Sequence, residues 1–134
     1  MRVFVTKRFG RFQRKEKISD VVLNEAIARA ERGQIDATLG RHLIKQRIGR
    51  TGQGRSGGYR TVVAYRMGDR AVFLFGFAKN ERDNIAPDEL EDLRLVAQGW
   101  LEAPTGKIEA SLKDGAIEEL KHGEESGEPL ARGS

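Results

Sequence analysis

The chain has 134 residues and no cysteine, which excludes disulfide bonds and thiolate zinc sites and is typical of a reducing compartment. Its length predicts one domain with its own core. The two histidines, His42 and His122, show no ligand spacing, so we expect no metal site and no cofactor. The sequence contains neither an apolar run of ~20 residues nor a signal peptide, and we therefore expect a cytoplasmic protein.

The formal net charge of +4 conceals a strong asymmetry along the chain. Residues 1–82 contain 19 of the 24 lysines and arginines but 7 of the 20 acidic residues, so the acids concentrate in residues 83–134. A basic body of this kind favours a polyanionic partner, although small soluble domains are also often basic without one.

The N-terminal part predicts one strand and two helices. Residues 3–6, VFVT, are β-branched and aromatic, as in strands. In residues 8–17, Phe9 and Phe12 are three residues apart, which favours a short helix. Ser19 or Asp20 caps a second helix with a continuous apolar stripe, which Gly33 ends. We expect the two helices to cover one face of a sheet; an interaction hairpin is the alternative.

Three strands in a meander follow a connection at residues 34–42. Residues 43–48, LIKQRI, alternate, with Lys45 and Arg47 on one face. A long glycine-rich turn at residues 49–58 leads to a strand at 59–67, and Gly68-Asp69 predicts a hairpin to an apolar strand at 70–79.

The C-terminal part predicts a helix that begins at Pro87 and carries an apolar stripe as far as Leu101. A short helix at 108–112 is expected next, while residues 116–121 fit either a strand or a helical turn. The fold class is therefore α+β, a small antiparallel meander sheet with two N-terminal helices and a C-terminal helix segregated to one face. We expect residues 1–103 to form the domain and residues 104–134 an acidic, partly ordered extension with a frayed end.

The glycines at 49–57 imitate two nucleotide-binding motifs, a Walker A loop and a dinucleotide fingerprint. Both motifs need a helix N-terminus after the glycines to hold phosphate. The residues that follow, GYRTVVAY, predict a strand, so we reject both motifs.

Basic residues near the ends of the three predicted strands favour a phosphate-binding surface. In a meander, Lys45, Arg47, Arg60, Lys79 and Arg82 can converge, with Tyr59 and Tyr65 available to stack on bases. The alternative is an ordinary solvated sheet face. We find no acid–base pair of the usual kind, so catalysis would rest on cations, which RNA permits because its 2′-hydroxyl is an internal nucleophile.

The segments GRSGGYRTVVAY and GFAKNERDNI, with the Pro-Asp-Glu-Leu helix start, resemble the HigB branch of the RelE/ParE superfamily of bacterial toxins. The similarity spans about Val3 to Leu101 and is strongest from Lys45 to Leu90. It implies a small sheet with two N-terminal helices and a metal-independent mRNA interferase, an endoribonuclease that cuts mRNA in the ribosomal A site and inhibits translation. It also implies an antitoxin partner, usually of the helix-turn-helix type.

The resemblance assigns catalytic roles to Lys45, Arg47 and Arg60. The residues expected to bind RNA are Arg50, Arg55, Tyr59, Lys79, Asn80 and Arg82. The chain departs from the family pattern at Asn80, where an arginine is common, and at Ile85-Ala86, where a tyrosine is common. It also has no histidine in the site region, unlike some HigB proteins.

Two other functions stay open at this stage. One is a ParE-like toxin that binds DNA gyrase and has no nuclease activity, and the other is a non-catalytic nucleic-acid-binding module.

An antitoxin would cover the basic face with acidic residues or displace an element there. The acidic segment 118–128 could instead screen that face weakly, or it could be a passive end.

Overall fold

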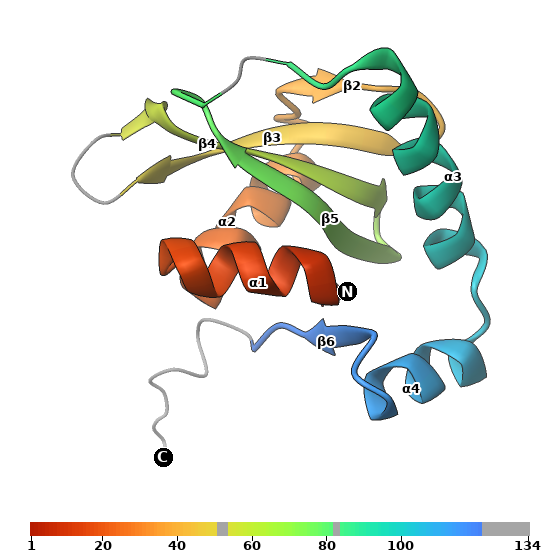
Figure 1. The fold of residues 1–134 in the computed structure, drawn as a ribbon. Coiled ribbons are helices and arrows are strands. Elements are labelled where there is room, and N and C mark those ends of the chain that lie inside the picture. Colours follow the sequence, from red (N-terminus) through yellow and green to blue (C-terminus); the bar gives the residue numbers. More distant parts are fainter. Residues whose placement is uncertain (51–53, 82–83, 122–134) are drawn as a thin grey trace.

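A computed structural model describes residues 1–50, 54–81 and 84–121, without the side chains of residues 50 and 54–57. Its elements are β1 (Arg2–Thr6), α1 (Lys7–Glu16), α2 (Asp20–Glu31), β2 (Ala37–Thr38), β3 (Leu43–Arg50), β4 (Gly54–Arg66), β5 (Arg70–Ala78), α3 (Pro87–Glu102), α4 (Thr105–Lys113) and β6 (Ile117–Glu119) (Figure 1). The helices and β5 agree with the sequence pattern. The glycine-rich turn predicted at residues 49–58 was too long, because β3 continues to Arg50 and β4 begins at Gly54. Within the described part of the chain, no helix is long and apolar enough to cross a membrane.

The strands form one six-stranded sheet in the order β2-β3-β4-β5-β1-β6. The predicted meander is present as β3-β4-β5, all antiparallel. The prediction of a purely antiparallel sheet was wrong, because β1 pairs with β5 in parallel. β1 is separated from β5 by α1, α2 and three strands, and such a long connection permits a parallel pair.

Helices cover both faces of the sheet, so the expectation of helices on one face was also wrong (Figure 1). One core cluster joins α1 and α2 to Ile44, Val63 and Phe73. The other joins α3 to Val62 and Leu74. Because neighbouring residues of β4 and β5 enter opposite clusters, these strands carry continuous apolar runs, as strands buried on both faces do.

Local capping explains where the first two helices begin. The Thr6 hydroxyl accepts a hydrogen bond from Phe9 N–H at 3.2 Å, and the Ser19 hydroxyl accepts one from Val22 N–H at 3.2 Å. Both bonds satisfy N–H groups that a helix start leaves unpaired. The predicted Ser19 cap is therefore confirmed.

The last strand comes from the segment that the sequence left undecided. Residues 117–119 form β6, which pairs antiparallel with β1. The Arg2 guanidinium bonds Glu119 and Glu109 at 2.8–2.9 Å, and these hydrogen bonds raise the pKa of Arg2. The predicted domain ended at residue 103, but β6, which forms one edge of the sheet, lies beyond that position.

Gly76 allows α1 to lie directly on β5. A Cβ at this position would lie 2.5 Å from Phe12 Cε2 and 3.0 Å from Phe9 Cε1. The Phe12 ring packs edge-on against Tyr59 and tilted against Phe9, so it has little freedom to move away. The absence of a side chain therefore sets the distance between helix and sheet.

We predict that Gly76→Ala lowers the free energy of unfolding by about 1–3 kcal/mol, the usual cost of overpacking a core. The matched control is Gly99→Ala in α3, where an added Cβ meets nothing within 4 Å. Gly99→Ala should instead stabilise the protein by about 0.5–1 kcal/mol. Urea denaturation of both variants measures the difference, and equal midpoints would contradict this role of Gly76.

Candidate nucleic-acid interface

The register of β3 and β4 places two arginines directly opposite each other. Arg47 pairs with Arg60, and the adjacent pair on the same face is Lys45 with Val62. The N–H and C=O of Arg47 bond side chains at the outer edge of β3, so they point away from β4. Arg47 and Arg60 therefore form a non-hydrogen-bonded pair, the type in which opposite side chains lie closer, with Cα atoms about 4.5 Å apart. Two like charges in this position repel each other.

Arg60 has no partner for one of its donors. Its side chain is half-buried, and its Nη1 atom is buried with no hydrogen bond among the described residues. Within the same part of the chain, no carboxylate forms an ion pair with it. A buried donor without an acceptor is destabilising, and native structures seldom keep one without a reason. An anion placed beside Arg60 would satisfy both the donor and the charge.

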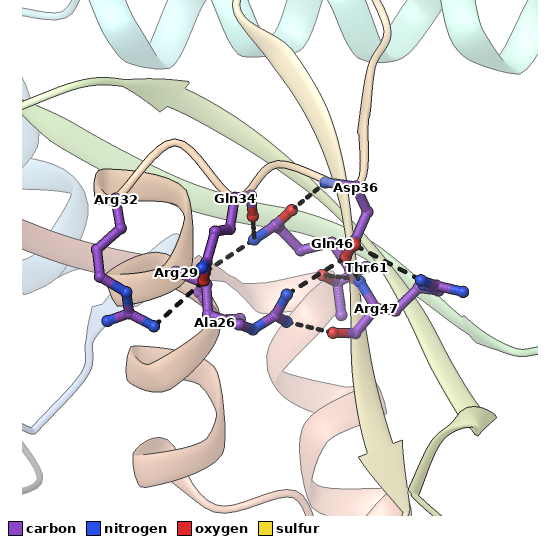
Figure 2. A network of polar contacts seen from close by, with 8 residues as sticks. All are labelled: Ala26, Arg29, Arg32, Gln34, Asp36, Gln46, Arg47 and Thr61. Carbon is purple, nitrogen blue, oxygen red and sulfur yellow. Dashed lines mark hydrogen bonds and ion pairs between the residues drawn. The ribbon is translucent and has the colours of Figure 1, made fainter.

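Arg47 is held by side chains that replace a missing strand. β2 begins at Ala37, which pairs with Lys45, so among the described residues Arg47 has no strand neighbour on its outer edge. The Asp36 carboxylate accepts from Arg47 N–H at 2.7 Å and lies 3.8 Å from its guanidinium, while Arg29 donates to the Arg47 carbonyl (Figure 2). The backbone of Arg47 is therefore fixed, and its side chain is 45% exposed.

Gln46 fixes the position of Asp36 from the face of the sheet that α2 covers. Its side chain is fully buried, and its amide donates to the Ala26 carbonyl at 2.9 Å and accepts from Asp36 N–H at 2.8 Å (Figure 2). The next strand contributes as well, because the Thr61 hydroxyl donates to the Gln46 carbonyl at 2.8 Å. Gln46 thereby ties α2, the segment before β2 and β3 together, and it sets the position of Asp36 against Arg47.

Two lysines extend the basic surface. Lys45 is half-buried and forms no ion pair with any described residue. Lys79 is exposed, and its N–H donates to the Gly58 carbonyl at 3.1 Å, which keeps it beside β4. We call Lys45, Arg47, Arg60 and Lys79 the basic site. Phe77 lies opposite Arg60 in the β4–β5 register and belongs to the same face.

The two tyrosines do not belong to the basic site. Tyr59 is buried and donates to the Glu16 carboxylate of α1, and Tyr65 is buried and donates to the Glu31 carboxylate of α2. Burial and the bond to Glu31 raise the pKa of the Tyr65 phenol. Both rings pack in the cluster on the opposite face from Arg60, so the expectation that they stack on RNA bases there was wrong.

The other predicted binding residues are placed only in part. The side chains of Arg50 and Arg55 and the whole of Arg82 lie outside the described residues. Asn80 is exposed and follows Lys79 in the turn after β5. The structure therefore brings together Lys45, Arg47, Arg60 and Lys79 around the ends of β3, β4 and β5.

The residues that hold the basic site in place were not predicted from the sequence. Asp36, Gln46 and Arg29 were not singled out, although Gln46 had a recognisable signal. It is a polar residue at an inward position of an alternating strand, between Ile44 and Ile48, and such a residue needs buried partners. The contacts of Arg29 and Asp36 depend on tertiary structure and left no local pattern.

The arrangement can bind and polarise an anion through its cations. Guanidinium groups offer parallel donors that match two oxygens of a phosphate, and lysine adds a point charge. Because the backbone of Arg47 is fixed by buried neighbours, its donor is preorganised rather than ordered by the ligand.

Comparison with known proteins gives one family. A family model described as the RelE toxin of the RelE/RelB toxin–antitoxin system matches residues 1–120, which is nearly all of the described chain. The match extends through α4 and β6. No curated protein sequence matches the chain.

We predict that Gln46→Met destabilises the protein by about 1–3 kcal/mol, although the two side chains have similar shapes. The change leaves the buried Ala26 carbonyl and the Asp36 N–H without their partner. The matched control is Gln98→Met on the exposed side of α3, which should change stability by less than about 0.5 kcal/mol. Guanidinium denaturation followed by circular dichroism compares them, and a Gln46→Met midpoint equal to the control would contradict the role given to Gln46.

Proposed function

The chain belongs to the RelE toxin family of toxin–antitoxin systems, and from this premise we propose that it is a ribosome-dependent endoribonuclease that cleaves mRNA and inhibits translation. The observation that carries the proposal is the opposed pair Arg47–Arg60, in which Arg60 keeps a buried donor without a partner in the part of the chain that the structure describes. A scissile phosphate supplies the missing acceptor and relieves the repulsion between the two guanidinium groups.

The reaction needs no metal or cofactor in this proposal. The ribose 2′-hydroxyl gives its proton to water as its oxygen attacks the adjacent phosphorus. The bond to the 5′-oxygen breaks, and the departing oxygen takes up a proton from water, so that a 2′,3′-cyclic phosphate and a 5′-hydroxyl are formed. A guanidinium cannot accept a proton in a protein, so Arg47 stabilises the developing 2′-alkoxide as a cation. Lys45 lies one position along the same face and, as an ammonium, helps to hold the same alkoxide while the proton leaves. Arg60 stabilises the charge that grows on the phosphate oxygens.

Lys79 positions the RNA backbone beyond the reacting phosphate. It is exposed at the end of β5 and held beside Gly58 of β4, two residues along the strand from Arg60. Arg50, Arg55, Asn80 and Arg82 are proposed to extend the same contact to neighbouring phosphates. Tyr59 has no part in this proposal, because its ring is buried on the opposite face.

The finer family assignment is also a proposal. The segments GGYR and AKNERDN support the HigB branch, and with it an antitoxin of the helix-turn-helix type. Such an antitoxin would neutralise the toxin by placing carboxylates against the basic site or by displacing an element beside it. A cytoplasmic location follows from the ribosome as the proposed target.

We predict that Arg60→Ala lowers mRNA cleavage on translating ribosomes by about 10²–10³, the usual loss when one preorganised donor is removed. The fold should survive, since the variant also removes a repulsion and an unpaired buried donor. The matched control is Arg11→Ala, which replaces an exposed arginine of α1 that has no partner among the described residues. This variant should cleave normally.

Cleavage is read by primer extension on a reporter mRNA, and melting curves verify folding. A folded Arg60→Ala protein with full activity would remove Arg60 from the mechanism, and wild-type toxicity through DNA damage without cleavage would favour a gyrase inhibitor.

We also predict that affinity for single-stranded RNA falls steeply with salt concentration. Each phosphate contact releases counterions, so replacing Lys45, Arg47 or Lys79 by glutamine should reduce the slope of log K against log salt by about 0.7 each. The control is Lys107→Gln, at an exposed position of α4. Fluorescence anisotropy at several salt concentrations gives the slopes. Slopes that do not change in any of the three variants would show that this surface does not contact phosphate.

A further inference from the structure

The turn between β2 and β3 has a backbone that its residues do not favour. Gly40, Arg41 and His42 all have positive φ angles, of 88°, 53° and 63°. Leu43 N–H donates to the Gly40 carbonyl at 3.0 Å, so Arg41 and His42 are the central residues of a β-turn. A turn with positive φ at both central positions favours Asn-Gly, because a Cβ is strained there. Arg41 therefore stands where local stability would select asparagine, aspartate or glycine.

The turn presents positive charge on an open surface. Arg41 and His42 are exposed, and with Arg66 they line two cavities of about 500 and 540 Å³ on either side of the turn. Arg66 pairs with Asp69 at 3.0 Å, and Glu102 lines one of the cavities and accepts from Gln98. Arg41 has no carboxylate partner among the described residues.

The backbone of the turn also has donors to offer. Across the described residues, neither the Arg41 N–H nor the His42 N–H donates to a protein acceptor. Adjacent N–H groups in a turn of this kind form a concave site for an anion, and the arginine side chain adds charge-assisted donors to it. Among the described residues, Glu102 is the one carboxylate that lines either cavity, and it accepts a hydrogen bond from Gln98.

The turn lies at the end of the β3–β4 pair where β3 begins, and the pair Arg47–Arg60 lies in the middle of the two strands. Leu43, which closes the turn, pairs with Ala64, four residues along the strand from the pair Arg47–Arg60. Four residues of strand span about 13 Å. The outer edge of the sheet between them is β2, the edge strand, whose residue Thr38 is exposed. One extended RNA strand can therefore follow this edge from one site to the other.

We propose that the Arg41–His42 turn is a second RNA contact, which binds a backbone phosphate outside the cleavage site. This contact rests on the proposed function, because it takes RNA as the substrate of the basic site. It explains why a strained turn carries an arginine: the residue contributes affinity at the expense of local stability.

Arg41→Gly tests the contact because it removes the charge and the strain together. The matched control is Lys17→Gly, which removes one exposed positive charge and one Cβ at a φ of 57°, at the end of α1. Both variants should keep the wild-type melting temperature or exceed it by up to about 5 °C. Only Arg41→Gly should bind a short fluorescein-labelled oligouridine about three- to tenfold more weakly at about 50 mM salt, with a slope lower by about 0.7.

The outcomes separate this contact from the proposed function. Wild-type affinity and slope in Arg41→Gly, or equal weakening in both glycine variants, would overturn the second contact. The absence of salt-dependent oligouridine binding by the wild-type protein would overturn it as well. A different result would contradict the proposed function, namely normal mRNA cleavage by a folded Arg60→Ala protein.

Discussion

The side-chain alternation of β3 controls both the core and the basic site. Gln46 points into the cluster beneath α2 and bonds that helix, while Lys45 and Arg47 point to the opposite face. A shift of one residue in the β3–β4 register would expose Gln46 and bury the two cations. The hydrogen bonds of Gln46 therefore specify the register as well as adding stability, and the geometry of the basic site depends on that register.

Local rules of stability are broken at two places on the β3–β4 pair. In the middle of the pair Arg47 and Arg60 bring like charges together, and at the turn where β3 begins Arg41 occupies a position suited to asparagine, aspartate or glycine. Other elements follow ordinary rules of capping and burial, as Ser19 and the apolar residues of β4 illustrate. Both exceptions on the β3–β4 pair involve arginines, which is consistent with an anionic ligand.

Much of the fold was accessible from sequence, and the failures have physical causes. Long periodic segments gave α2, α3 and the meander, whereas β2 and β6 are too short for any period to show. The parallel pairing of β1 with β5 depends on tertiary contacts. The basic residues of the site were predicted because strand alternation places Lys45 and Arg47 together. The faces of the tyrosines were missed although β4 contained the signal, since Tyr59 and Tyr65 are at odd-numbered positions and Arg60 at an even one.

The charge asymmetry along the sequence becomes an asymmetry across the sheet. Glu109 and Glu119 pair with Arg2, and Glu118 lies 3.9 Å from Arg14, all near the β6 edge. Part of the acidic C-terminal region is thus used to neutralise the end of the body that carries β1 and α1. At β3 and β4 the described cations have few carboxylates, and Asp36 is shared between Arg29 and Arg47. Among the described residues, Arg41, Lys45 and Arg60 have no carboxylate partner, so positive charge remains on the part of the sheet that holds both the basic site and the Arg41–His42 turn, and it would direct a polyanion there during encounter.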